Sequence, residues 1–354
     1  MQSSISCAWI LDSGGAGRGA WQGGVLYELM RWTRQHGCYP SVAMGASAGG
    51  YAAADVATGH EATVMKGWTA WGTSEIPAQY PLAAEVADQW PRSRFRRHLH
   101  ASIRYVMDET ELDGIFDSVG QRKLLLFTSR VRRCDGRLLG RSELGRLFAM
   151  AATRKLPRLL KYLPRFCYVE PVVFATNLPS DMCSEFVRPL TRQNYHYAVE
   201  ASCLVPVAMG PPVSLGQISQ TFEYPNDARA VFLDGGFSLK MPMAIFEHDS
   251  RFRALAQWVA TRRTVIFCCD PNGRLWETSM RVHALNTHPS VARAREEGAL
   301  LTIHPDHTVE ASFLCLDPVV IRRTFDRGRQ QGRRLLADER VCRFLSGFER
   351  TVSV

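Results

Sequence analysis

The chain has 354 residues, of which 46% are hydrophobic and 22% charged, and this globular composition excludes a wholly disordered, collagen-like or coiled-coil protein. Lys and Arg number 43 against 34 Asp and Glu, and the net charge of +9 favours an anionic partner such as nucleic acid, an acidic membrane surface or a phosphate-bearing substrate. The length suits either two domains or one α/β domain with a large insertion.

Alternating strands and helices are predicted at the start of the chain. The apolar runs Ile5–Leu11 and Pro40–Met44 predict short buried strands, and Ala20–Gln35 and Ala48–Thr58 predict helices. Strand, glycine-containing loop and helix, repeated in this order, indicate a parallel sheet covered by helices on both faces.

The middle of the chain is basic. Cationic residues are mixed with aromatic and aliphatic ones in Pro91–Arg104 and Thr153–Phe166. We interpret residues from about 75 to 165 as a candidate helical insertion or cap on a single domain that spans residues 1–354. A basic cap of this kind either lies against an anionic membrane surface or has solvated cations.

Strand patterns resume in the second half of the chain. They fall at Val172–Thr176, Val231–Leu233, Thr264–Cys268 and Leu301–Ile303. Phe325–Ala337, which is rich in Arg and Gln, predicts a late surface helix.

A glycine-rich stretch, Asp12–Gly24, lies between the first strand and the first helix. Such a turn exposes backbone N–H groups at the positive end of a helix and can bind an anion. Gly15, Gly17 and Ala20 satisfy the loose dinucleotide pattern G-x-G-x-x-A, but residues 37–45 lack the acidic residue expected about 20 positions further on. No G-K-[ST] follows, so a phosphate-binding P-loop is not supported.

A second motif, G-A-S-A-G, occupies residues 45–49 between a predicted strand and a predicted helix. The chain must turn sharply there and hold the Ser47 hydroxyl at the apex, and the turn leaves no room for side chains at Gly45 and Gly49. The helix that follows favours developing negative charge near Ser47. This spacing predicts a nucleophilic serine.

A third motif, D-G-G at Asp234–Gly236, follows the apolar run Ala230–Leu233. A strand that ends in Asp and two glycines places a carboxylate in a tight turn at the end of the strand. An aspartate that only caps a turn would give the same pattern.

In this order, the three motifs resemble the patatin-like phospholipase family, and the resemblance covers most of the chain. S-G-G-A-G-R-G, with the following Gly24–Leu26, is similar to the family's oxyanion loop. Two further segments match: Ala201-Ser202 with Val205-Pro206 and Pro211-Pro212 is similar to the family's A-S…P…P-P, and D-G-G with Met241-Pro242 to its Asp motif.

The resemblance implies a three-layer α/β/α fold with a central, mostly parallel sheet. It implies that Ser47 is the nucleophile and Asp234 its catalytic partner, without a histidine. The implied oxyanion donors are the backbone amides of Gly14, Gly15, Ala16 and Gly17. The family usually has three consecutive glycines; Ala16 stands at the third position, where it still offers an N–H but resists a positive φ.

The implied activity is lipid acyl hydrolysis of the phospholipase A or lysophospholipase type, on a glycerophospholipid or lysophospholipid. No metal, organic cofactor or nucleic acid partner is implied. An ordinary aspartate, with a pKa of about 3.9, is a weak base, so we expect Asp234 to be buried and its pKa raised. Arg18 either orients the loop or contacts a phosphate.

Other interpretations stay open. A Ser-Asp-His triad is possible because five histidines follow Asp234: His248, His283, His288, His304 and His307. The chain could also be a soluble carboxylesterase or thioesterase for smaller substrates. A non-catalytic nucleotide- or anion-binding protein would use the loop at Asp12–Gly24.

The cysteines and apolar runs favour a cytoplasmic protein. The ten cysteines include no C-x-x-C pair and no Cys/His cluster at zinc spacing, and in a chain with an ample core they favour reduced thiols. The apolar start Cys7–Leu11 is shorter than the core of a signal peptide, and no run of about 18 apolar residues predicts a transmembrane helix.

Overall fold

The computed structural model describes residues 5–12, 14–81, 94–117, 122–135, 137, 143, 167–205, 209, 213–214, 230–242, 249–278 and 283–347. Within them, nine strands form one sheet whose main path runs β5-β4-β3-β2-β1-β8-β9, with β7 paired to β3 and β6 paired to β7. The strands are β1 (Ile5–Leu11), β2 (Pro40–Ala46), β3 (Lys123–Arg133), β4 (Cys167–Ala175), β5 (Val187–Pro189), β6 (Val213–Ser214), β7 (Val231–Asp234), β8 (Arg263–Phe267) and β9 (Leu300–Ile303).

The sheet is mostly parallel, as expected. β1 pairs in parallel with β2 and β8, β2 with β3, β8 with β9, and β4 with β5. The antiparallel pairs are β3 with β4, β3 with β7, and β6 with β7.

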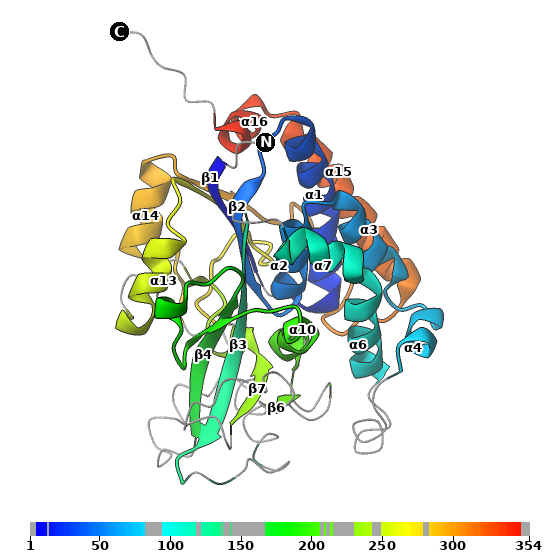
Figure 1. Ribbon diagram of the computed structural model, residues 1–354. Helices are drawn as coiled ribbons and strands as arrows, with labels where there is room; N and C mark the ends of the chain where they lie inside the picture. Colours follow the sequence, from blue (N-terminus) through cyan, green and yellow to red (C-terminus); the bar gives the residue numbers. More distant parts are fainter. Residues whose placement is uncertain are drawn as a thin grey trace.

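Helices cover both faces of the sheet, which gives the three layers of an α/β/α fold (Figure 1). One face carries α13 (Arg253–Trp258) and α14 (Pro289–Glu296). The helices of the other side are α1 (Gly15–Gln35), α2 (Ala48–Thr58), α3 (Glu61–Ala70), α4 (Glu75–Gln79), α6 (Arg94–Val106), α7 (Glu109–Phe116), α10 (Tyr195–Cys203), α15 (Pro318–Leu336) and α16 (Glu339–Ser346).

The burial of both faces of β1 explains why its sequence is mostly apolar. Successive side chains of a strand point to opposite faces. Ala8 and Ile10 pack in the core cluster beneath α13 and α14, whereas Cys7, Trp9 and Leu11 pack in the cluster beneath α1 and α2. Both faces are therefore buried, as a parallel strand between two helical layers requires.

The predicted elements agree well with the structure, apart from some of their boundaries. The first helix begins at Gly15 instead of Ala20, because the glycine motif itself forms its first turn. The predicted late surface helix is part of the longer α15, one face of which is buried against α1.

The candidate cap, residues 75–165, contains both helices and sheet. The structure describes α4, α6 and α7 there, but also β3, which lies at the centre of the sheet and is not cap. Thr153–Phe166 lies outside the described residues. Whether the remaining part acts as a cap stays a prediction.

Cations of α6 face inward to a buried carboxylate. Arg96 Nε lies 2.6 Å from Glu200 Oε1, and His100 Nδ1 lies 3.3 Å from Oε2. Burial alone would raise the pKa of Glu200, but His100 and the charges of Arg96 and Arg104 lower it to about 2. This part of the basic stretch therefore ties α6 to α10.

The contact between α1 and α15 depends on glycines that let two helix backbones approach closely. A Cβ at Gly24 would lie 2.0 Å from the carbonyl oxygen of Phe325, and a Cβ at Gly328 would lie 2.1 Å from that of Trp21. Neither carbonyl can move without disturbing its own helix.

Gly328→Ala should therefore destabilise the protein although alanine is the better helix former. We expect the free energy of unfolding to fall by about 1–3 kcal/mol, as for other overpacked sites, in urea denaturation. Gly114→Ala in α7 is the matched control, because its Cβ would have no neighbour closer than 3.4 Å; it should be neutral or stabilising by about 0.5–1 kcal/mol. Equal effects of the two substitutions would contradict this account.

Candidate active site

Strand pairing brings Ser47 and Asp234 together. β2 pairs with the first half of β3 and ends with Ala46 opposite Phe127. β7 pairs with the second half of β3 and ends with Asp234 opposite Thr128. Because Phe127 and Thr128 are adjacent, the residue after β2 and the last residue of β7 lie side by side.

Ser47 occupies a strained turn between β2 and α2. Its φ of 58° and ψ of −134° lie in a region that non-glycine residues rarely adopt. A Cβ at Gly45 would lie 2.3 Å from the carbonyl oxygen of Gly49, and a Cβ at Gly49 would lie 2.1 Å from that of Leu11. The two glycines of the G-x-S-x-G motif are thus required by close backbone contacts.

The end of α10 holds this turn in place. The Ser47 N–H donates to the carbonyl oxygen of Ser202 at 3.0 Å and lies 3.2 Å from its Oγ. Ser202 Oγ donates in turn to the Phe127 carbonyl at 2.7 Å, and the Cys203 thiol donates to the Ser47 carbonyl at 3.0 Å. The A-S motif therefore links the turn to β3.

The backbone of Asp234 is fixed on both sides. Its N–H donates to the carbonyl oxygen of Leu204 at 2.9 Å, and its own carbonyl accepts from Ser129 Oγ at 2.7 Å. Its side-chain Oδ1 accepts from the N–H of Gly236 at 2.8 Å. Only the Oδ2 side of the carboxyl group is left to act on a neighbour.

Burial raises the pKa of Asp234 to about 6, and the side chain of Ser47, the Gly236 N–H and the charge of Lys240 each oppose part of that rise. The residue is 3% exposed. Oδ2 has no hydrogen-bond partner with good geometry among the described residues. The Ser47 hydroxyl is nevertheless close enough to lower the pKa of the carboxyl group.

The glycine loop opens α1 next to Ser47. Gly14 is the N-cap, and Gly15 to Gly17 form the first turn, where N–H groups have no carbonyl partner within the helix. Gly15 has a φ of 64°, which favours glycine. The Ala16 N–H donates to the carbonyl oxygen of Phe313 at 2.9 Å, so one of the four expected oxyanion donors is already engaged.

Ser47, Gly15 and Ala16 line one cavity of about 30 Å³. Its remaining walls are mostly apolar and aromatic: Ala48, Tyr51, Trp68, Trp71, Phe95, Leu99, Cys203, Met209 and Phe313. The volume is enough for about one water molecule, and sites for drug-sized ligands measure about 300–1,000 Å³. An acyl chain needs more room than this volume offers.

A buried ion pair joins the glycine loop to the D-G-G segment, and the sequence did not predict it. Lys240 Nζ lies 3.0 Å from Asp12 Oδ1, while Oδ2 accepts from the N–H of Cys269 at 2.9 Å. Burial alone would lower the pKa of Lys240, but the Asp12 charge raises it overall. The available signal for one partner was the position of Asp12 directly after the apolar strand β1; Lys240 had no such signal.

The other expected residues have less specific surroundings. Arg18 is half-buried on the first turn of α1. Its positive charge opposes part of the rise that burial causes in the pKa of the Cys269 thiol. His248 lies outside the described residues, and no histidine is among the described groups that shift the pKa of Asp234. Among the residues that the structure describes, no group of three or more His, Cys, Asp or Glu side chains is placed to hold a metal ion.

A family comparison matches residues 10–247 to the patatin-like phospholipase family. The chain belongs to this family. Its members are lipid acyl hydrolases, and the matched segment contains the glycine loop, the Ser47 turn and Asp234. No individual curated protein matches the chain. None of the described helices is both long and apolar enough to cross a membrane.

The Lys240–Asp12 pair yields a stability prediction. Lys240→Met should lower the free energy of unfolding by about 3–5 kcal/mol, because it leaves the buried Asp12 carboxylate without its counter-charge. Chemical denaturation at neutral pH measures the loss. Lys66→Met is the control, since its partner Asp108 is half-exposed and exposed pairs contribute at most about 1 kcal/mol. Similar losses in both variants would contradict the assignment.

Proposed function

We propose that this chain hydrolyses acyl esters of glycerophospholipids or lysophospholipids through Ser47 and Asp234. The observation that carries the proposal is the β3 register, which sets a strained serine beside a buried aspartate of raised pKa. Ser47 also lines one cavity with residues of the helix N-terminus that the glycine loop forms. Perturbed titration next to a cavity is typical of catalytic groups.

In the proposed reaction, Ser47 Oγ attacks the ester carbonyl carbon and gives its proton to the Asp234 carboxylate. Amides of residues 14–17 stabilise the oxyanion. The proton then passes to the leaving alcohol or lysolipid as the ester C–O bond breaks. Water attacks the acyl-enzyme, Asp234 accepts a proton from it, and the fatty acid leaves as Ser47 is restored.

The engaged amide of Ala16 limits which donors are ready. Since its N–H is bonded to Phe313, the hole available with Phe313 in place would use Gly14, Gly15 and Gly17. Movement of Phe313 would free the Ala16 amide at the same time as it widens the cavity.

Covalent labelling tests the nucleophile. A fluorophosphonate probe should label the protein at Ser47, and Ser47→Ala should lose both labelling and ester hydrolysis, because no other group would be activated. Ser346→Ala, on α16, should be labelled like the wild type. Labelling that survives Ser47→Ala would refute the proposed nucleophile and leave the anion-binding alternative.

The pH dependence tests the base. Hydrolysis, measured as kcat/KM, should rise with pH through about 6 and then level off, because Asp234 accepts a proton only when ionised. Asp234→Asn should be inactive.

The same pKa predicts the effect on stability. A carboxyl whose pKa is raised by folding destabilises the protein once it is ionised, so this cost is present above about pH 6 and disappears as the pH falls towards 3.8. Asp234→Asn should thus be more stable than the wild type at pH 8, by up to roughly 3 kcal/mol.

The alternative catalytic base is a histidine. If hydrolysis is lost when one of the histidines is replaced by alanine, a Ser-Asp-His triad would replace the dyad.

The small cavity gives the esterase alternative its one supporting observation. The Ser47 cavity would have to widen less to admit a short acyl group, as in a soluble carboxylesterase or thioesterase, than to admit a phospholipid. Rates on esters of increasing chain length separate the two: a rate that falls steadily beyond short acyl chains would favour the esterase, and a preference for long chains the lipid hydrolase.

A further inference from the structure

Exposed apolar side chains gather on one short segment beside the candidate active site. Among the described residues, six large hydrophobic side chains are at least 36% exposed, and three of them lie within seven residues: Phe313 at 47%, Leu314 at 40% and Val319 at 63%. Contiguous apolar exposure of this kind commonly marks an interaction surface. We call residues 311–317 the strap.

One residue of the strap, Phe313, lines the Ser47 cavity. At one end, the Phe313 carbonyl accepts from Ala16, and the Phe313 ring lines the cavity. Further along, the Cys315 carbonyl accepts from Trp71 Nε1 at 3.1 Å. The strap follows the segment matched to the family, which ends at residue 247, so it is an addition to the matched part of the site.

Among the described residues that line the cavity, Phe313 is the one that solvent reaches. The other described lining residues are buried, whereas nearly half of the Phe313 surface is exposed. Because Phe313 is both a cavity wall and a solvent-exposed side chain, movement of the strap is the route by which we expect the volume of about 30 Å³ to widen.

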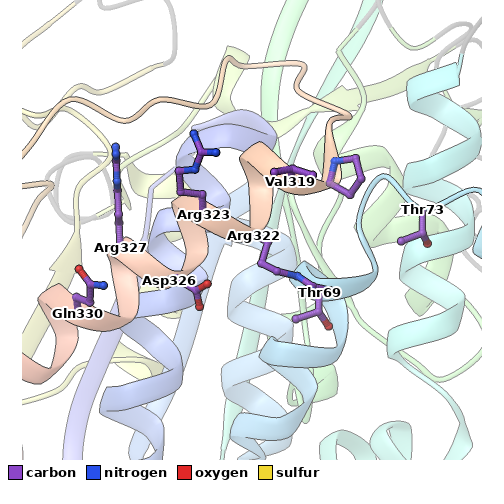
Figure 2. Close-up of a pocket in the computed structure, with 9 residues that line it drawn as sticks. Thr69, Thr73, Val319, Arg322, Arg323, Asp326, Arg327 and Gln330 are labelled. Carbon is purple, nitrogen blue, oxygen red and sulfur yellow. The ribbon is translucent and has the colours of Figure 1, made fainter.

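A basic groove of about 590 Å³ continues from the strap between α3 and α15 (Figure 2). On the α15 side the groove is lined at helical spacing by Val319, the three arginines Arg322, Arg323 and Arg327, and one acidic residue, Asp326; Thr69 lines it on the α3 side. Arg323 and Arg327 lie 2.8 and 3.5 Å from the carboxylate of Glu310. Arg322 forms no ion pair with a carboxylate within the described residues, although Asp326 lines the same groove.

We propose that this surface, composed of Phe313, Leu314, Val319 and the groove arginines, docks the chain on an anionic lipid bilayer and draws Phe313 out of the Ser47 cavity. Phe313, Leu314 and Val319 enter the boundary between headgroups and acyl chains, and Arg322 contacts a lipid phosphate. The second step rests on the proposed hydrolase function; the docking step does not.

Docking is measured on the Ser47→Ala protein, so that no lipid is consumed. The probes are vesicles of phosphatidylcholine alone and of phosphatidylcholine mixed with phosphatidylglycerol, in sedimentation assays at low salt. Leu314→Ser with Val319→Ser should weaken binding to the mixed vesicles by about tenfold or more, because apolar surface no longer leaves water. Arg322→Gln should weaken it about fivefold, as expected for loss of about 1 kcal/mol per surface cation.

Matched controls lie elsewhere on the molecule. Tyr168→Ser, on β4, removes a side chain that is 38% exposed, and Arg340→Gln, on α16, removes an exposed cation. Both should bind vesicles like the parent. Equal losses in control and test variants, or no loss in the test variants, would overturn the docking surface.

The opening step is measured by the rate of fluorophosphonate labelling in the Ser47 protein. Mixed vesicles should accelerate labelling at least about fivefold, and the Leu314→Ser/Val319→Ser variant should lose that acceleration. Vesicle binding without any change in labelling rate would overturn the opening step alone. Docking without labelling under any condition would refute the proposed hydrolase and leave the docking surface standing.

A second copy of the chain is the competing occupant. If the surface instead forms a dimer, sedimentation velocity should show concentration-dependent association that Leu314→Ser/Val319→Ser abolishes, with vesicle binding unchanged. That result would overturn the lipid proposal.

Discussion

The hydrogen-bond ladder along β3 is the constraint on which the candidate site depends. One stretch of this strand holds β2 in parallel and the next holds β7 in antiparallel, so that two segments far apart in sequence end at adjacent residues, Phe127 and Thr128. Successive side chains of a strand alternate between faces, and a slip of one residue in either pairing would separate Ser47 from Asp234. Ser202 and Ser129 reinforce the arrangement by bonding to the backbone at both ends of this junction.

Burial determines the chemistry that this junction can perform. Asp234 lies in a site where its charge is poorly solvated, and its pKa rises towards the range in which a carboxylate can accept a proton from a hydroxyl. Lys240 lies near enough to moderate that rise, yet its direct partner is Asp12. The pair joins the start of the glycine loop to the segment that carries Asp234, so the proposed oxyanion donors and the proposed base share one rigid support.

Some cations of the chain form ion pairs with buried carboxylates, whereas others are exposed to solvent. Arg96 and His100 of α6 face Glu200, and Arg329 and Arg333 of α15 face Glu28. These cations hold helices together and contribute little to long-range attraction. The basic stretch 91–104, which composition alone made a candidate for membrane contact, is thus partly structural. The exposed arginines at the start of α15 lie beside exposed apolar residues, and the lipid proposal rests on that combination.

Local sequence patterns were sufficient for the α/β class and for six of the nine described strands, namely β1, β2, β4, β7, β8 and β9; they also singled out the three motifs. Strand burial follows from apolar runs, and the turn at Ser47 follows from the two glycines that its close backbone contacts require. The patterns could not reveal that β3 belongs to the sheet within a basic stretch, because strand pairing is non-local. They also missed the Asp12–Lys240 pair and the engagement of Ala16 by Phe313. Those contacts join residues hundreds of positions apart, and only the packing of the folded chain brings them within bonding distance.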